Sequence, residues 1–255
     1  MSQPPYRKIQ RMQALAWGVL CHLAFAAAVL SMMVKLYGGM QAGPTLPLPA
    51  AILWDAFLIL QFPLFHSLLL TPKGGQWMAR LIPGGLGKPL RTTTFAIIAS
   101  LQILLCFLFW APLGSVFYEL HGLPRLATTL VYIFGWGLLM KSMADAGLGV
   151  QMGYKGWWAV WKNQNVTYSP WAAKGTLRHT RHPMYLAYTL LLWSGPVWTL
   201  DHVAIASTWS LYCIIAPLHK EARYKKRYGQ VFQSYQKNVP YFLPRFLKHK
   251  PEKSS

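Results

Sequence analysis

Acidic residues and cysteines are both scarce in this chain of 255 residues, and each shortage excludes a class of protein. Charged residues make up 12% of the sequence and hydrophobic residues 54%, a balance that excludes an ordinary water-soluble domain. The three cysteines, Cys21, Cys106 and Cys213, lie in separate apolar runs, so neither a disulfide framework nor a metal site is predicted. No Gly-x-Gly-x-x-Gly motif follows a predicted strand, which excludes a Rossmann domain.

The shortage of acids leaves the chain strongly positive. Its 25 Lys and Arg residues outnumber its 6 Asp and Glu residues, for a net charge of +19. In a soluble protein this charge would indicate a nucleic-acid partner. Here the basic residues lie between apolar runs and not along one face. We therefore predict membrane lipids as partners, and no nucleic acid.

Long apolar runs are what the sequence has in place of charge. Four of them, residues 13–36, 50–70, 92–113 and 126–144, are each near the roughly 20 residues that cross a bilayer. Two shorter runs, 184–200 and 203–217, are separated only by Asp201 and His202 and predict a short helical hairpin, which either crosses the bilayer or re-enters. The predicted fold class is an all-α polytopic membrane bundle of about six hydrophobic helices. We divide it into a four-helix transmembrane region, 1–150, and a C-terminal region, 151–255, that ends in a cytoplasmic amphipathic segment.

Basic residues alternate between the two sides of this bundle. Arg7, Lys8 and Arg11 precede the first run, and further basic clusters follow the second and the fourth runs. The loops 37–49 and 114–125 together contain a single Lys or Arg residue, Arg125. Short loops rich in Lys and Arg stay in the cytoplasm. Both termini are therefore predicted to be cytoplasmic. Segment 151–168 interleaves Trp and Tyr with Lys, which indicates either an interfacial anchor or the aromatic wall of a substrate entry gate.

The sequence Arg181-His182-Pro183-Met184-Tyr185 opens the predicted hairpin. Pro183 suits the first turn of a helix, because its missing N–H would be unpaired there, so the helix should begin near His182. Free N–H groups at that helix end, together with Arg181, favour binding of a carboxylate or phosphate. The alternative is that the basic residues here only anchor a helix end to anionic lipid.

Downstream of the hairpin, the spacing of Tyr and Phe residues between 224 and 235 predicts a basic amphipathic helix. Glu221 stands apart, as the only carboxylate between Asp201 and Glu252. A lone acid among cations at the exit of a membrane helix suits three roles: binding ribose hydroxyls, balancing a cationic ligand or accepting a proton.

These residues carry a resemblance. Residues 181–185, Glu221, Tyr228-Gly229, Tyr235 and the Val-Pro-Tyr-Phe-Leu-Pro segment 239–244 resemble the C-terminal signature of membrane methyltransferases related to isoprenylcysteine carboxyl methyltransferase and phospholipid N-methyltransferases. Upstream, the His66-Ser67 pair and Trp-Ala-Pro-Leu at 110–113 are similar to the bacterial branch that includes methanethiol S-methyltransferase. The resemblance covers nearly the whole chain. Lys220 departs from it, since many relatives carry a Glu-Glu pair where this chain has Lys220-Glu221.

The resemblance implies an S-adenosylmethionine-dependent integral enzyme of a bacterial inner membrane, which methylates the sulfur or carboxyl group of a small thiol or a lipophilic acceptor. Two residues are candidates for proton transfer, Glu221 and His66, because His66 is predicted at the cytoplasmic end of its helix, at the depth of Arg181; the alternative for His66 is a structural role. The cofactor site that the resemblance implies is formed by Arg181, His182, Pro183, Tyr185, Glu221, Tyr224 and Tyr228.

Two other functions fit parts of the pattern. The C-terminal segment also resembles NADPH-dependent sterol and steroid reductases, although Met184 stands where that family usually has Asn and the chain is short for a sterol reductase. The third hypothesis is a non-enzymatic membrane scaffold, whose polar cluster is only a lipid anchor. Under that hypothesis, replacement of Glu221 would leave the function intact.

Overall fold

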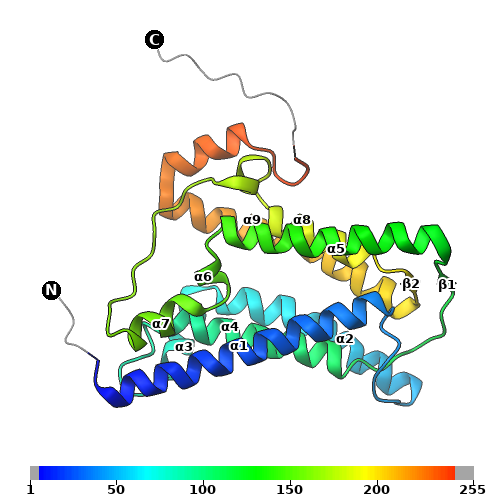
Figure 1. Ribbon diagram of the computed structural model, residues 1–255, viewed down its shortest axis with the longest axis horizontal. Coiled ribbons are helices and arrows are strands. Elements are labelled where there is room, and N and C mark those ends of the chain that lie inside the picture. Colours follow the sequence, from blue (N-terminus) through cyan, green and yellow to red (C-terminus); the bar gives the residue numbers. More distant parts are fainter. Residues whose placement is uncertain (1–5, 245–255) are drawn as a thin grey trace, which may run out of the picture.

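The computed structural model describes residues 6–244, and the predictions that concern residues 1–5 and 245–255 lie outside it. The described chain is almost entirely helical (Figure 1). In chain order the elements are α1 (Lys8–Tyr37), α2 (Leu48–Leu69), α3 (Pro72–Arg80), α4 (Arg91–Leu108), β1 (Tyr118–Glu119), α5 (Gly122–Asp145), α6 (Leu148–Gln151), α7 (Tyr154–Trp161), η1 (Gly175–Arg178), α8 (Pro183–Trp193), β2 (Val197–Trp198) and α9 (Leu200–Asn238).

Four helices, α1, α2, α4 and α5, are long and apolar enough to cross a membrane. They match the four predicted spans, so the expectation of an all-helical membrane protein is confirmed in outline. Two boundaries differ by five residues, because α1 begins at Lys8, before the predicted run 13–36, and α4 ends at Leu108 and not near residue 113. The chain leaves the helix there because Pro112 cannot continue it and the backbone N–H groups of Ala111 and Leu113 are bound by carboxylates from other helices.

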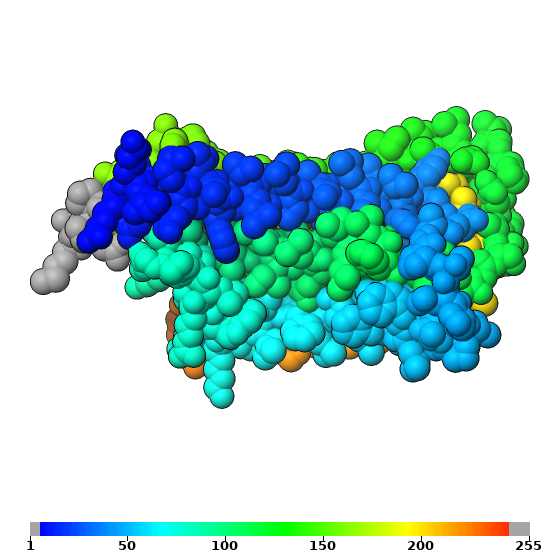
Figure 2. All heavy atoms as spheres, turned by 90° about the horizontal axis from the view of Figure 1, so that it is seen from below, coloured from blue at the N-terminus to red at the C-terminus, as the bar shows by residue number. Residues whose placement is uncertain are grey.

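The helices form two layers (Figure 1). In the view of that figure α5, α8 and α9 lie above α1, α2 and α4. Seen from below, α1 runs the length of the molecule with α4 between it and α2 (Figure 2). Large apolar side chains of α1, such as Leu23, Leu30 and Val34, stay at least 60% exposed. Such an outward face suits contact with lipid tails.

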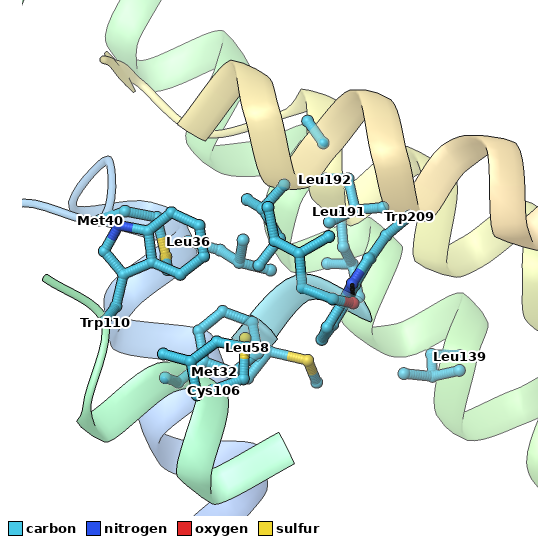
Figure 3. Packing of buried hydrophobic residues seen from close by; sticks show 14 of the residues in the cluster. Met32, Leu36, Met40, Leu58, Cys106, Trp110, Leu139, Leu191, Leu192 and Trp209 are labelled. Carbon is cyan, nitrogen blue, oxygen red and sulfur yellow. Dashed lines mark hydrogen bonds between the residues drawn. The ribbon is translucent and has the colours of Figure 1, made fainter. Parts of the chain in front are cut away.

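The main core lies between the two layers (Figure 3). Met32 and Leu36 of α1 and Leu58 of α2 meet Leu191 and Trp209 of the hairpin there. The indole Nε1 of Trp209 donates a hydrogen bond to the backbone oxygen of Ile59, 3.1 Å away. This bond satisfies the single polar atom of a buried indole and fixes α9 against α2.

At one end of the bundle the connection from α4 to α5 meets the connection from α8 to α9. The two short strands pair there, antiparallel, with Tyr118 opposite Trp198 and Glu119 opposite Val197 (Figure 1). Asp201, at the start of α9, accepts hydrogen bonds from the indole Nε1 of Trp110 and the backbone N–H of Leu113. We call this region, β1 and β2 with residues 109–121, the strand end.

The opposite end holds η1, the beginning of α8 and residues 218–244, and we call it the basic end. Helix α8 starts at Pro183 with His182 as its N-cap, as predicted. The predicted single amphipathic helix was wrong, because α9 bends sharply at Gly229 (φ 55°, ψ −130°). This conformation is open to glycine and strained for other residues. The last nine residues of α9 consequently turn back, as the orange end of the helix in Figure 1 shows.

Candidate active site

A cavity of about 490 Å³ opens at the basic end, a size typical of small-molecule sites. Its walls come from segments far apart in sequence: the end of α5, residues 168–174, the beginning of α8 and both parts of α9. One wall is aromatic and contains Tyr168, Trp171, Tyr224, Tyr228, Phe232 and Tyr235. Six basic residues also line it, Arg91, Lys155, Lys174, Arg181, Lys220 and Arg227, against only two acids, Asp145 and Glu221.

Glu221 is the centre of a buried polar network on the cavity wall, and only 7% of its surface is exposed. Its Oε1 lies 2.9 Å from Arg181 Nε and 2.9 Å from His182 Nε2. Its Oε2 accepts a hydrogen bond from the Gln236 side-chain amide. Both oxygens of this carboxylate are thus engaged, by three side chains from two segments of the chain.

His182 is neutral in this network. Burial, followed by the positive charges of Lys220 and Arg181, lowers the pKa of His182 to about 3. These effects outweigh the nearby carboxylate, so Nε2–H donates to Glu221 as an uncharged imidazole. His182 Nδ1 is then a buried acceptor with no hydrogen-bond partner among residues 6–244.

Arg181 ties the first part of the signature to the end of the chain. Its backbone N–H donates to the backbone oxygen of Pro240, and its side-chain Nη1 donates to the backbone oxygen of Gln236 at 2.8 Å. Its Nε forms the ion pair with Glu221 without hydrogen-bond geometry, so this buried N–H remains unpaired within the described chain. The guanidinium also lies 5.4 Å from the ring centre of Tyr241.

The bend at Gly229 places the returning part of α9 over the signature. The Tyr235 hydroxyl donates to the backbone oxygen of Leu177 at 2.6 Å, and burial raises the pKa of Tyr235, which keeps that hydroxyl protonated. Farther along, the Tyr241 hydroxyl donates to the backbone oxygen of Ile214. The segment 230–244 therefore closes one side of the cavity as a strap, which we name the C-terminal strap.

Asp145, the last residue of α5, holds η1 in place. Its Oδ2 accepts hydrogen bonds from both the backbone N–H and the hydroxyl of Thr176, at 2.7 and 2.8 Å. Gly175 has φ +49°, and a Cβ there would lie 2.3 Å from the same oxygen. Only glycine fits this close approach, so the Asp145 contact fixes the turn that leads into Arg181.

The predicted site residues divide into two groups. Arg181, His182, Glu221, Tyr224 and Tyr228 do line one cavity. Pro183 is the first residue of the helix behind the cavity, and the Tyr185 ring packs edge-on against His182, 5.9 Å between ring centres. His66 is not brought to the site, since its ring lies between Phe62 and Phe95, 4.9 and 4.8 Å away.

Sequence reasoning missed several residues that shape the cavity. Trp171, 4.8 Å from Tyr235 between ring centres, lies in a stretch without regular structure, and nothing in the sequence distinguished it from the other tryptophans. Gln236 and Asp145 were also missed. Their contacts depend on the bend at Gly229 and on the position of η1, neither of which has a local sequence pattern apart from the glycines themselves.

A second hollow, of about 450 Å³, lies beside α6 and α7 in the segment predicted as either an anchor or a gate. Tyr154 and Trp158 form part of its wall, with their rings stacked 5.3 Å apart. It shares Gly147, Val150 and Lys155 with the first cavity. The two hollows are therefore neighbours, which suits the gate interpretation without testing it.

Several curated proteins are similar to the chain over nearly its whole length. Methanethiol S-methyltransferase of Crocosphaera subtropica is 23% identical over 92% of this chain and 93% of its own. The protein of the same name from a Pseudomonas strain is 26% identical over 92% and 91%. Nurim of Mus musculus is 24% identical over 66% of this chain and 65% of its own. These relatives confirm the resemblance drawn from the sequence. No family model and no solved structure matches the chain.

Proposed function

We propose that this protein is an integral membrane methyltransferase that moves a methyl group from S-adenosylmethionine to a small thiol. The observation that carries the proposal is the convergence of Arg181, His182 and Glu221 with an aromatic wall on one cavity. The similarity to proteins named methanethiol S-methyltransferase supports the reaction class. A lipid or isoprenylated acceptor, methylated at sulfur or carboxyl, is the broader alternative.

The residues of the cavity fit this donor, which has an amino-acid end, a sulfonium centre and an adenine ring. Arg181 has donors left over for the carboxylate, and two buried polar atoms, Arg181 Nε and His182 Nδ1, form no hydrogen bond within residues 6–244. The aromatic wall would hold the adenine, and Glu221 would face the cationic part. When bound, the donor supplies a methyl group activated by the positive charge on its sulfur.

In this proposal the protein aligns the methyl donor with the acceptor and excludes water from the reaction. In-line methyl transfer needs an aligned donor and acceptor and little water. The Glu221 network fixes Arg181 and His182 through buried contacts, and the C-terminal strap covers one side of the cavity. Because the strand pairing places the tip of the hairpin beside the α4–α5 connection, we propose that α8 and α9 also cross the membrane, with the basic end and both termini in the cytoplasm.

The excess of basic over acidic side chains in the cavity also fits the phosphates of NADPH, so the reductase remains the second candidate. Equilibrium binding of radiolabelled S-adenosylmethionine and of NADPH to detergent-purified protein separates the two. We expect binding of the methyl donor and formation of methyl thioether from added ethanethiol. Binding of NADPH alone would favour the reductase, and binding of neither would favour the scaffold.

Glu221→Ala is the decisive variant. It leaves Arg181 buried without its counter-charge, so we expect donor binding to fall at least about 100-fold, equal to about 2.7 kcal/mol, and thioether formation to fall below detection. The matched control is Glu119→Ala, which removes a partly exposed glutamate at the strand end. Unchanged donor binding by a folded Glu221→Ala protein would refute the proposed site.

A further inference from the structure

Lys220 is a basic residue of the cavity wall that combines partial burial with the lack of an ionic partner among the described residues. It lines the cavity beside Glu221, half-buried, at the position where the chain departs from the Glu-Glu pair of the resembling family. Its Nζ lies 5.5 Å from the ring centre of Tyr224 and 6.0 Å from that of Tyr185. Within residues 6–244 no carboxylate comes within ion-pair distance of this ammonium and no acceptor bonds to it. Its three donors therefore face two aromatic rings and open cavity.

The surroundings of Lys220 make its uncharged amine more accessible near neutral pH than that of an ordinary exposed lysine. Burial, followed by the charge of Arg223, lowers the pKa of Lys220 to about 8, and Glu221 opposes this only in part. The groups that face it from α8 add no negative charge, because His182 is neutral and Tyr185 presents its ring. A base whose pKa lies near the working pH is the kind that transfers protons efficiently.

Methylation of a thiol requires a proton acceptor, and the other candidates are occupied or distant. Both oxygens of Glu221 are held by Arg181, His182 and Gln236. His182 Nε2 is held by Glu221, and His182 Nδ1, although it has no hydrogen-bond partner among the described residues, belongs to an imidazole whose pKa of about 3 makes it a weak base. His66 lies between two phenylalanine rings outside the cavity wall. Three lysines border the cavity, Lys155, Lys174 and Lys220, and Lys220 is the one that lies next to Glu221 and between the rings of Tyr185 and Tyr224.

We propose that Lys220 is the proton acceptor for the methyl acceptor, and that this acceptor is a small thiol with the acidity of an alkanethiol. The inference rests on the proposed function. The neutral amine takes the S–H proton and becomes an ammonium, while the thiolate sulfur bonds to the methyl carbon of the donor. The bond from that carbon to the donor's sulfur breaks, and its electron pair stays on that sulfur. The ammonium later releases the proton to water.

The test compares two thiols in two variants. Ethanethiol is protonated at pH 7 and needs a base, whereas 4-nitrothiophenol is already largely ionised. For Lys220→Met we expect kcat with ethanethiol to fall about 100-fold and kcat with 4-nitrothiophenol to change by less than about threefold. Lys220→Arg keeps the charge but cannot accept a proton, so it should lose ethanethiol activity as well. Lys225→Met, an exposed lysine on the same helix, is the control.

Failure of the proton-acceptor role and failure of the proposed function give different results. If Lys220→Met loses both thiols equally, or if Lys220→Arg keeps wild-type activity with ethanethiol, the proton-acceptor role is refuted. If the unaltered protein binds no S-adenosylmethionine and methylates neither thiol, the proposed function fails first. Binding of S-adenosylhomocysteine should change less than about threefold in Lys220→Met, which shows that the variant is folded.

A second measurement needs no turnover. Competitive acetylation of the S-adenosylhomocysteine-bound protein across a pH series, followed by mass spectrometry, reports the protonation of individual lysines. Lys220 should reach half of its maximal reactivity near pH 8. A half-point near the ordinary lysine value of about 10.4 would overturn the proposal.

Discussion

The two ends of the bundle each bury a carboxylate, and they use it differently. Asp201 at the strand end is 1% exposed and binds the uncharged indole of Trp110 and the backbone of Leu113. Glu221 at the basic end is 7% exposed and binds a guanidinium, an imidazole and an amide beside a cavity. Burial of an acid is therefore not a sign of function by itself. The kind of donor around the acid and the presence of an adjacent cavity distinguish a structural carboxylate from one in a candidate active site.

The donors explain why the ends differ. At the strand end Asp201 binds the main chain of the α4–α5 connection, so its contacts are satisfied within the fold and the surroundings are packed with Trp110 and Phe107. Buried polar atoms without a hydrogen bond within residues 6–244 occur at both ends, Asp55 Oδ2 and His202 Nδ1 near the strand end and Arg181 Nε and His182 Nδ1 at the basic end, but the latter two belong to residues that line a cavity. Unsatisfied buried groups are costly to keep, which favours a bound ligand over a purely structural role.

The largest expected effect on stability is at the strand end. Asp201→Ala leaves the Trp110 indole and the Leu113 backbone N–H buried without an acceptor, so we expect a loss of about 3 kcal/mol and a thermal midpoint lower by about 10 °C in detergent. Donor binding by the remaining folded protein should be unchanged. Asp201→Asn, which keeps one acceptor oxygen, should lose about half as much. The comparison breaks down if Asp201→Ala weakens donor binding as strongly as Glu221→Ala.

The next effect is a loss of stability at acidic pH that arises from His182 at the basic end. Because the pKa of His182 is about 3 in the folded protein and about 6.5 when unfolded, the unfolded chain binds more protons below pH 6.5. Stability is therefore full above pH 6.5 and falls as the pH drops toward 3, by about 2 kcal/mol at pH 5. Thermal unfolding across this range measures it. His182→Gln, which can still donate to Glu221, should reduce the loss at pH 5 by about 2 kcal/mol, and Asp201→Asn should not; an equal response in all three proteins would assign the titration elsewhere.

The smallest effect concerns the bend that creates the C-terminal strap. Alanine at Gly229 meets no atom within 4 Å, so Gly229→Ala tests backbone conformation alone. We expect a cost of about 1–2 kcal/mol and donor binding about fivefold to tenfold weaker, measured by equilibrium dialysis. Gly85→Ala is the matched control, because Gly85 also has positive φ and open space but lies outside the cavity wall. Equal loss of binding in both variants would show that the bend does not position the strap.

Much of the architecture could be predicted from local patterns. The four spans follow from the lengths of apolar runs, and the start of α8 follows from Pro183, because both depend on residues adjacent in the chain. The strand pairing could not be predicted, since Tyr118–Glu119 and Val197–Trp198 are two-residue strands held by the surrounding helices. The prediction of a single amphipathic helix was wrong for a related reason. The residues on both sides of Gly229 have helical spacing, so the sequence pattern does not reveal a bend at one glycine.

By itself the sequence determined a basic, apolar helical chain with a cluster of signature residues at one end, because hydrophobicity and charge are properties of each segment alone. The tertiary structure decided which members of that cluster meet. His182 and Glu221 are 39 residues apart, Asp145 and Thr176 are 31 apart, and Trp110 and Asp201 are 91 apart. Whether such distant pairs meet depends on how whole helices pack and where the chain turns. This packing gives Asp201 a structural role at the strand end and places Glu221 beside a cavity at the basic end.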